Sequence, residues 1–150
     1  MASVDVLTEI VIACPRATVA AFAADPDNAC AWYANIESVE WKTARPLQVG
    51  SKIDFVARFL GRRLAYTYEI VELVPGERVV MRTSDGPFPM ETTYTWQPTG
   101  RDETLMTLRN RGMPAGFSRF LAPFMVPAMR KANRNDLARL KALLEKQTEP

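Results

Sequence analysis

Six strand-like segments in succession, followed by one long helical pattern, constrain the fold of this chain more than any other feature. The six segments are rich in β-branched and aromatic residues and cover residues 36–43, 51–60, 63–74, 78–84, 89–97 and 104–111. Turn signals separate most of them: Gly61, Pro75-Gly76, Gly86-Pro87 and Thr99-Gly100. Strands joined by short turns pair antiparallel, so we expect one meandering sheet.

Shorter elements precede these segments. Residues 4–12 alternate between apolar and polar, which predicts a first strand. The Ala-rich residues 16–24 predict a short helix, which Asp25-Pro26-Asp27 ends. A second short helix is expected over residues 28–33, with Asp27 as its N-cap.

The C-terminal part of the chain carries the helical pattern. Apolar residues recur there at helical spacing: Phe117, Phe120, Leu121, Phe124, Ala128, Ala132, Leu137, Leu140 and Leu144. Pro123 and Pro127 interrupt helical hydrogen bonding, so the helix should begin late or kink there. The apolar face of the sheet needs cover, and this helix is long enough to supply it. We predict one α+β domain over residues 1–150, in which a curved antiparallel sheet of about seven strands wraps on the long C-terminal helix, with two short helices after the first strand.

Strand register divides the residues of the sheet between two faces. A turn at Gly61-Arg62 would pair four sets of residues on one face: Phe59–Leu64, Ala57–Tyr66, Phe55–Tyr68 and Ile53–Ile70. The inner face then gathers apolar and aromatic side chains: Phe55, Phe59, Tyr66, Tyr68, Met81, Met90, Tyr94, Trp96, Met106 and Leu108. Its polar groups are few: the tyrosine hydroxyls, the Trp96 N–H, Thr83, Thr92 and Asn110. These side chains either fill a core against the helix or line an apolar cavity, and the residues alone leave both open.

Charged residues occupy the opposite face. A turn at Pro75-Gly76 would place Glu69 opposite Arg82, and a Trp96–Thr104 pairing would place Glu91 opposite Arg109. Such cross-strand pairs stabilise a sheet by ~0.2–1 kcal/mol. We interpret these four residues as solvated outer-face pairs, because a catalytic role would need buried positions and shifted pKa values.

Residue counts exclude several kinds of function. The chain has no histidine, which excludes Ser-His-Asp and Cys-His catalysis and a His-ligated metal. A formal net charge of +2 gives a nucleic-acid partner little support. Cys14 and Cys30 form no CxxC pair, so we expect no disulfide framework, no metal and no cofactor. The N-terminus lacks the pattern of a secretory signal and no run approaches the ~20 apolar residues of a spanning helix, so we expect a cytoplasmic protein without stable membrane insertion.

Three stretches together resemble a known family: IVIACPRATVAAFAADPDN, PLQVGSKIDFVARFLGRRLAYTYEIVELVPGERVVMRT and TTYTWQPTGRDETLMTLRNRG, the last before a long helix. With these stretches, almost the whole chain is similar to the START-like, or SRPBCC, superfamily, and within it to the polyketide cyclase/dehydrase-type branch. The resemblance implies a helix-grip fold, in which an antiparallel sheet wraps on the C-terminal helix around a hydrophobic cavity. The superfamily includes lipid carriers, ligand binders and aromatase/cyclases, so the fold alone does not choose among them.

Two functions follow as hypotheses. The first is binding or transport of a hydrophobic small molecule, such as a lipid, an isoprenoid or a polyketide-like aromatic. Its expected ligand-binding residues are Phe55, Phe59, Tyr66, Tyr68, Met81, Thr83, Met90, Tyr94, Trp96, Met106, Leu108, Asn110, Phe120 and Phe124. The alternative is a polyketide cyclase/dehydratase-type enzyme, whose candidate groups are Tyr66, Tyr68, Tyr94 and Asn110. No catalytic motif can be carried over from the family, so whether the protein is an enzyme stays open.

The C-terminal region suggests two further surfaces. A basic helix face could touch anionic lipid or simply be solvated, and we favour the second reading: Arg130, Lys131, Arg134, Arg139, Lys141 and Lys146. Bulky residues within 114–129 could form a lid over the cavity, a homodimer interface or part of the core: Phe117, Phe120, Phe124 and Met125.

Overall fold

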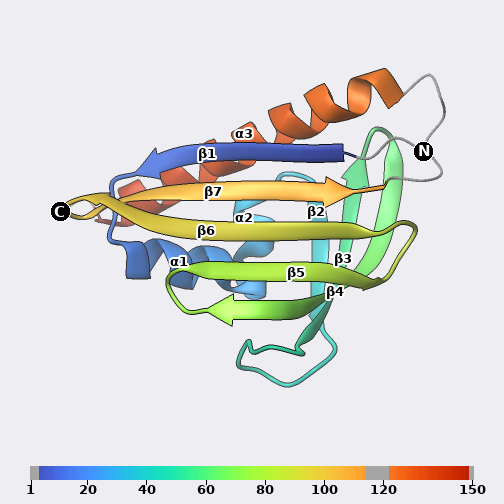
Figure 1. Cartoon of the computed structure of the whole chain (residues 1–150), viewed down its shortest axis with the longest axis horizontal. Helices are drawn as coiled ribbons and strands as arrows, with labels where there is room; N and C mark the ends of the chain where they lie inside the picture. Colours follow the sequence, from blue (N-terminus) through green and yellow to red (C-terminus); the bar gives the residue numbers. More distant parts are fainter. Residues whose placement is uncertain (1–3, 114–121, 149–150) are drawn as a thin grey trace.

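A single curled antiparallel sheet and one long helix make up most of the computed structural model, which describes residues 4–113 and 122–148. The strands, in the sheet order β1-β7-β6-β5-β4-β3-β2, are β1 (Val4–Ile12), β7 (Glu103–Gly112), β6 (Met90–Gly100), β5 (Arg78–Asp85), β4 (Arg62–Val74), β3 (Lys52–Phe59) and β2 (Ile36–Trp41). Helices α1 (Arg16–Ala24) and α2 (Ala29–Trp32) follow β1, and α3 (Ala122–Thr148) follows β7 (Figure 1). This confirms the predicted helix-grip fold.

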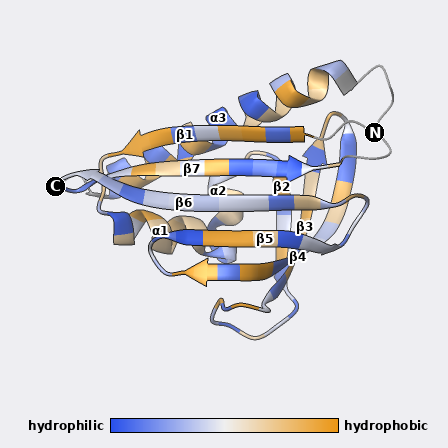
Figure 2. Cartoon of the chain, in the orientation of Figure 1, coloured by the Kyte–Doolittle hydropathy of each residue, from blue (hydrophilic) through white to orange (hydrophobic). Residues whose placement is uncertain are grey.

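The sheet bends so strongly that it encloses space. In Figure 1 strands β2 and β3 run almost at right angles to β5, β6 and β7, and α3 lies along β1. Leu137, Leu140 and Leu144 of α3 are buried in the same apolar cluster as Trp96 and Met106 of the sheet. The helix is therefore held by apolar burial against the inner face. Figure 2 shows hydrophobic and hydrophilic residues interspersed along the strands, as expected for a sheet with one covered face.

The two prolines of α3 lie near its described start. Pro123 follows Ala122 in the first turn, where a missing N–H removes no helical hydrogen bond, and Pro127 lies inside the helix. Phe117 and Phe120 of the predicted helix lie outside the described residues. No helix in the described ranges is long and apolar enough to cross a membrane.

The predicted cap of the second short helix is wrong. Pro26 begins a 3-10 turn, η1 (Pro26–Asn28), whose N-cap is Asp25, and the Asp25 carboxylate accepts the backbone N–H of Asp27 at 2.9 Å. Asp27 binds elsewhere, because its carboxylate accepts hydrogen bonds from Trp41 and Arg45. The N-cap is the residue before the proline, because Pro26 occupies the first position of the 3-10 turn.

Two predicted registers are wrong by two residues, which leaves every face assignment intact. The β3–β4 turn is formed by Leu60-Gly61, both with positive φ (50° and 78°), so Phe55 pairs with Tyr66 rather than Tyr68. Positive φ at both central residues is the geometry of a type I′ turn, which matches the twist of the strands. The β6–β7 turn similarly forms at Arg101-Asp102 instead of Thr99-Gly100.

The shifted β6–β7 register changes the partners of the outer charges. Trp96 pairs with Met106, and Glu91 lies opposite Arg111 and forms ion pairs with Arg111 and Arg82. The predicted Glu91–Arg109 pair is therefore wrong, because Arg109 binds Asp5 of β1.

The β4–β5 register is as predicted, but it arises differently. Glu69 lies opposite Arg82, although the turn has three residues between Val74 and Arg78 instead of two. A bulge at Val71 takes up the additional residue, so that Ile70 again pairs with Met81. The bulge also changes which residues of β4 face inward, from Tyr68 and Ile70 on one side to Leu73 on the other.

Candidate functional site

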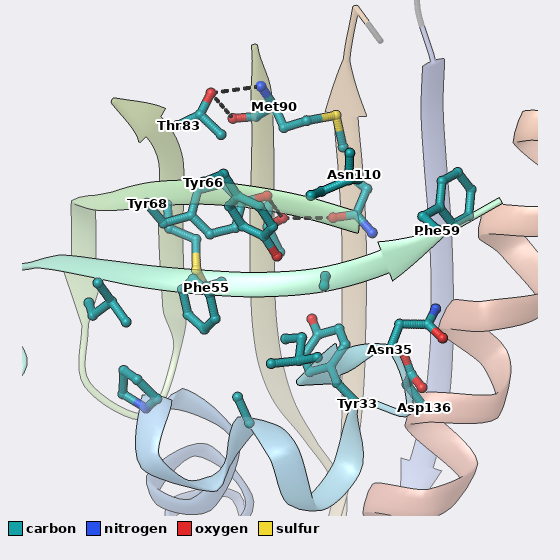
Figure 3. Close-up of a pocket in the computed structure, with 18 of the residues that line it drawn as sticks. Tyr33, Asn35, Phe55, Phe59, Tyr66, Tyr68, Thr83, Met90, Asn110 and Asp136 are labelled. Carbon is teal, nitrogen blue, oxygen red and sulfur yellow. Dashed lines mark hydrogen bonds between the residues drawn. The ribbon is translucent and has the colours of Figure 1, made fainter. Parts of the chain in front are cut away.

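A cavity of about 160 Å³ lies between the curled sheet, α2 and α3. Nine of the residues predicted to bind a ligand line it: Phe55, Phe59, Tyr66, Tyr68, Met81, Thr83, Met90, Tyr94 and Asn110. Figure 3 shows several of these side chains converging on the same space from separate strands. Their lining of a cavity is a finding, and their contact with a ligand stays a prediction.

The other five predicted residues lie elsewhere. Trp96, Met106 and Leu108 are buried but do not line the cavity. Met106 and Leu108 are packed in the apolar core, and Trp96 lines a separate hollow beside α1. Phe124 is 62% exposed and points away from the cavity, since the buried face of α3 passes through Met125 and Met129 instead. Phe120 lies outside the described residues. Core packing and cavity, which the sequence left as alternatives, thus occupy different parts of one sheet face.

Aromatic rings form the wall on the β3–β4 side. Phe55 and Tyr66 stack with ring centroids 5.6 Å apart, and Tyr68 meets Tyr66 edge-on at 5.0 Å. Tyr66 and Tyr68 are two residues apart on β4, and Phe55 lies directly opposite Tyr66 on β3, so strand alternation and pairing bring the three rings together. Offset and edge-on contacts hold such rings in fixed orientations, which gives the wall a defined shape.

A chain of hydrogen bonds crosses the sheet wall. The Thr92 hydroxyl donates to Asn110 Oδ1 at 2.7 Å, and the Tyr68 hydroxyl lies 2.7 Å from Thr92 Oγ1. Thr92 has only one hydroxyl proton, so Tyr68 must be the donor in the second bond. The chain therefore runs from Tyr68 through Thr92 to Asn110, and the amide nitrogen of Asn110 points away from Thr92 toward the α3 side of the cavity (Figure 3).

A second polar group lies at the α2–α3 end. The hydroxyls of Tyr33 and Tyr94 are 2.6 Å apart, and Asp136 of α3 lines the cavity beside them (Figure 3). Asp136 Oδ1 accepts the backbone N–H of Ala34 at 3.0 Å, which ties the segment after α2 to the long helix. This cluster joins three elements that are distant in sequence.

Burial controls the titration of these groups. It raises the pKa of Tyr68 to about 12, and it also raises the pKa of Tyr33, Tyr66 and Tyr94. All four hydroxyls are therefore protonated near neutral pH. Burial also raises the pKa of Asp136 from 3.8 to about 6, opposed by the hydrogen bond from Ala34. Asp136 is thus a cavity carboxyl that titrates close to neutrality.

Sequence reasoning missed the residues that α2 and α3 contribute. Trp32 ends the short helix α2 and Tyr33 follows it, so no strand alternation points to them. Asn133 and Asp136 occupy the buried stripe of α3, between Met129 and Leu140. Their signal was present as two polar residues at the spacing of the apolar ones, a pattern that indicates a polar lining rather than a solvated face.

A larger hollow of about 720 Å³ lies beside α1, lined by residues such as Ala20, Leu47, Leu73 and Val79. It is the more open of the two, and the cavity inside the sheet, which is more enclosed, desolvates its contents better. Binding sites for small apolar molecules are usually of the enclosed kind, so the cavity is the better candidate despite its smaller volume. The described residues contain no cluster of acidic or cysteine side chains that could hold a metal ion.

Known proteins share this architecture. The TTHA0849 protein from Thermus thermophilus aligns with a TM-score of 0.82 at 19% identity, over 97% of this chain and 100% of its own. The Zhui aromatase/cyclase from Streptomyces sp. R1128 aligns at 0.82 and 13% identity, over 99% and 97% of the two chains. A START superfamily protein from Mycobacterium smegmatis aligns at 0.81 and 14%, over 96% and 99%. At such identities the likeness shows the fold alone.

Family membership rests on the sequence itself. No curated protein matches the chain, but the profile of one family matches residues 3–145, which is nearly its full length. That family is described as polyketide cyclase / dehydrase and lipid transport. The helix-grip fold and the apolar cavity agree with this match, and the chain belongs to the polyketide cyclase / dehydrase and lipid transport family.

Proposed function

We propose that the protein binds a compact, mostly apolar small molecule with one or two oxygen atoms in the cavity inside the sheet, as a carrier or sensor of a lipid, isoprenoid or polyketide-like compound. The observation that carries this proposal is an aromatic-walled cavity with hydrogen-bonded polar side chains at two places in its wall. Those places are the Tyr68–Thr92–Asn110 chain and the Tyr33–Tyr94 pair. Apolar walls with a few convergent polar groups are typical of small-molecule sites.

The volume limits the size of the ligand. A cavity of about 160 Å³ is close to the ~150 Å³ that holds a benzene molecule in an apolar protein interior. It is smaller than the ~300–1,000 Å³ usual for drug-sized ligands. The expected ligand therefore has about one or two rings, or an equally short chain, unless the walls move apart on binding.

Mass spectrometry of the purified protein tests this proposal. The protein is measured under native conditions and then extracted with organic solvent to identify any apolar compound that remains bound. Phe55→Trp, purified in parallel from the same host, is the matched control, because the larger ring occupies the cavity. A compound present in the wild type and absent from the variant supports cavity binding. Equal amounts in both, together with no binding of an apolar dye by the wild type, would contradict it.

The alternative is a polyketide cyclase/dehydratase-type enzyme, and one observation favours it. Asp136 titrates close to neutrality and lies beside the Tyr33–Tyr94 hydroxyls, where it could exchange a proton with a bound substrate. A β-hydroxy ketone that loses water to form an enone provides an optical assay. Acceleration by the wild type that disappears in Asp136→Asn would favour the enzyme, and no acceleration would favour the carrier.

A further inference from the structure

The α2–α3 end of the cavity contains two buried hydrogen-bond donors without a partner. They are Nδ2 of Asn133, which is 4% exposed, and Nε1 of Trp32, which is fully buried. Both residues line the cavity, and Trp96 Nε1 is the one other buried side-chain atom in this state within 4–113 and 122–148. A buried donor left unpaired is costly, so two beside one cavity indicate a missing acceptor there.

Asn133 lies on the face of α3 that lines the cavity. Met129, Ala132, Asn133 and Asp136 all line the cavity, and they recur on α3 at the spacing of one helical face. Asn133 thus lies one turn from the carboxylate of Asp136, at the end of the cavity opposite the aromatic cluster of Phe55. A group bound between them would meet an N–H donor and a carboxylate together.

The remaining polar groups also offer donors to the cavity. The Tyr68–Thr92–Asn110 chain ends at the carbonyl oxygen of Asn110, which leaves the amide nitrogen as its free end. In the Tyr33–Tyr94 pair one hydroxyl donates and the other keeps its proton for a further acceptor. A ligand that satisfies these groups must therefore supply acceptors more than donors.

The charge at this end restricts the acceptor further. Asp136 is 2% exposed, and its carboxylate would repel a carboxylate or phosphate placed beside it in so dry an environment. A neutral oxygen acceptor satisfies Asn133 and Trp32 without that repulsion.

On the basis of the proposed ligand-binding function, we infer that the ligand is a neutral carbonyl compound of about one or two rings, such as a ketone, quinone or lactone. Its carbonyl oxygen accepts a hydrogen bond from Asn133 Nδ2 at the α3 end of the cavity, with Trp32 Nε1 as the second donor.

Four probes of similar size separate this inference from simple apolar binding. Acetophenone carries the carbonyl, 1-phenylethanol a hydroxyl, ethylbenzene no oxygen and benzoate a negative charge. Titrations by competition with an apolar dye give the four affinities for the wild type. One additional neutral hydrogen bond corresponds to ~5-fold in affinity, so acetophenone should bind about that much more tightly than ethylbenzene. 1-Phenylethanol should fall between them, and benzoate should bind more weakly than acetophenone.

Two variants on the same helix assign the preference to its donor. Asn133→Leu should bind acetophenone and ethylbenzene equally, while ethylbenzene keeps its wild-type affinity. Asn135→Leu makes the same replacement at an exposed position of α3 and should keep the wild-type preference. Trp32→Phe, which keeps a ring and removes the N–H, should reduce the preference in part.

A measurement on the wild type alone covers the case in which Asn133→Leu does not fold. Acetophenone, but not ethylbenzene, should shift the proton resonances of the Asn133 side-chain amide and the Trp32 indole N–H downfield.

The outcomes distinguish the carbonyl inference from the proposed binding of an apolar ligand. Equal wild-type affinities for acetophenone and ethylbenzene would overturn the carbonyl inference and leave apolar binding intact. A preference that survives in Asn133→Leu would also overturn it, since water or another group would then satisfy the buried donor. Failure of all four probes and of the dye would instead reject the proposed function, and the inference with it.

Discussion

Replacing Asp136 by asparagine should change how the stability of the protein depends on pH. Asp136 is 2% exposed, and burial raises its pKa from 3.8 to about 6 in the folded protein. Asparagine retains an oxygen that can accept the backbone N–H of Ala34 and carries no charge at any pH. The substitution thus removes the titration and keeps the contact.

The sign and size follow from linkage. Between pH 3.8 and about 6 the folded protein binds a proton at Asp136 that the unfolded chain has released, so rising pH favours unfolding. This contribution to stability is fully present below pH 3.8 and is lost as the pH rises through about 6. Each pKa unit corresponds to ~1.4 kcal/mol, so the wild type should lose up to ~3 kcal/mol between pH 4 and pH 7 that Asp136→Asn does not lose.

Urea unfolding at pH 4, 5, 6 and 7 measures this difference. The informative quantity is the free energy of unfolding of Asp136→Asn minus that of the wild type, because any pH-independent cost of the amide cancels between pH values. It should rise by ~1–3 kcal/mol from pH 4 to pH 7. Asp5→Asn is the control: the hydrogen bond with Arg109 lowers the pKa of Asp5, so its difference should stay flat over this range. A flat difference for Asp136→Asn as well would refute the argument that Asp136 is buried as a carboxylate.

Four further substitutions test other parts of the structure. Phe55→Trp should block binding of an apolar dye and cost less than the ~1–3 kcal/mol typical of overpacking, in paired dye titrations and urea melts; strong destabilisation without dye binding by the wild type would mean that no cavity exists. Tyr94→Phe should keep the fold and weaken an oxygenated ligand by ~0.5–1.5 kcal/mol in calorimetry, and an unchanged affinity would remove Tyr94 from the site. Arg109→Gln should change the free energy of unfolding by less than ~1 kcal/mol, because its ion pair with Asp5 is exposed on the outer face; a loss of several kcal/mol would contradict that placement. Leu60→Asn should stabilise the protein by ~0.5–1 kcal/mol, since asparagine tolerates the positive φ of 50° better than leucine, and a destabilised variant would argue against the type I′ turn.

The fold could be predicted because a register error of two residues leaves each side chain on the same face of the sheet. Phe55 was paired with Tyr68 and in fact pairs with Tyr66, yet all three rings face inward in either register. The turn that sets the register could not be predicted in the same way, because Leu60 adopts a positive φ that leucine disfavours. The pairing of β3 with β4 imposes that conformation, and the local sequence does not predict it.

The site was predictable only where it belongs to strands. Tyr68 and Asn110 were found from alternation, whereas Asn133 and Asp136 were overlooked because polar residues on a helix ordinarily face solvent. Their spacing with the apolar residues of α3 was a signal, but their burial depends on how α3 docks onto the sheet. Met106 shows the opposite error, since it has the alternation of a lining residue and is packed in the apolar core.

The bulge at Val71 has a consequence for how changes spread through the interior. On one side of the bulge, Tyr66, Tyr68 and Ile70 of β4 line the cavity. On the other side, Leu73 lines the hollow beside α1. The strand thus separates the two hollows, and even-numbered residues face inward before the bulge while Leu73 faces inward after it. A substitution that widens one compartment need not be transmitted along the backbone to the other, because the irregular residue can absorb a small rotation. Substitutions can therefore adapt the cavity to a different ligand while the packing beside α1 stays unchanged.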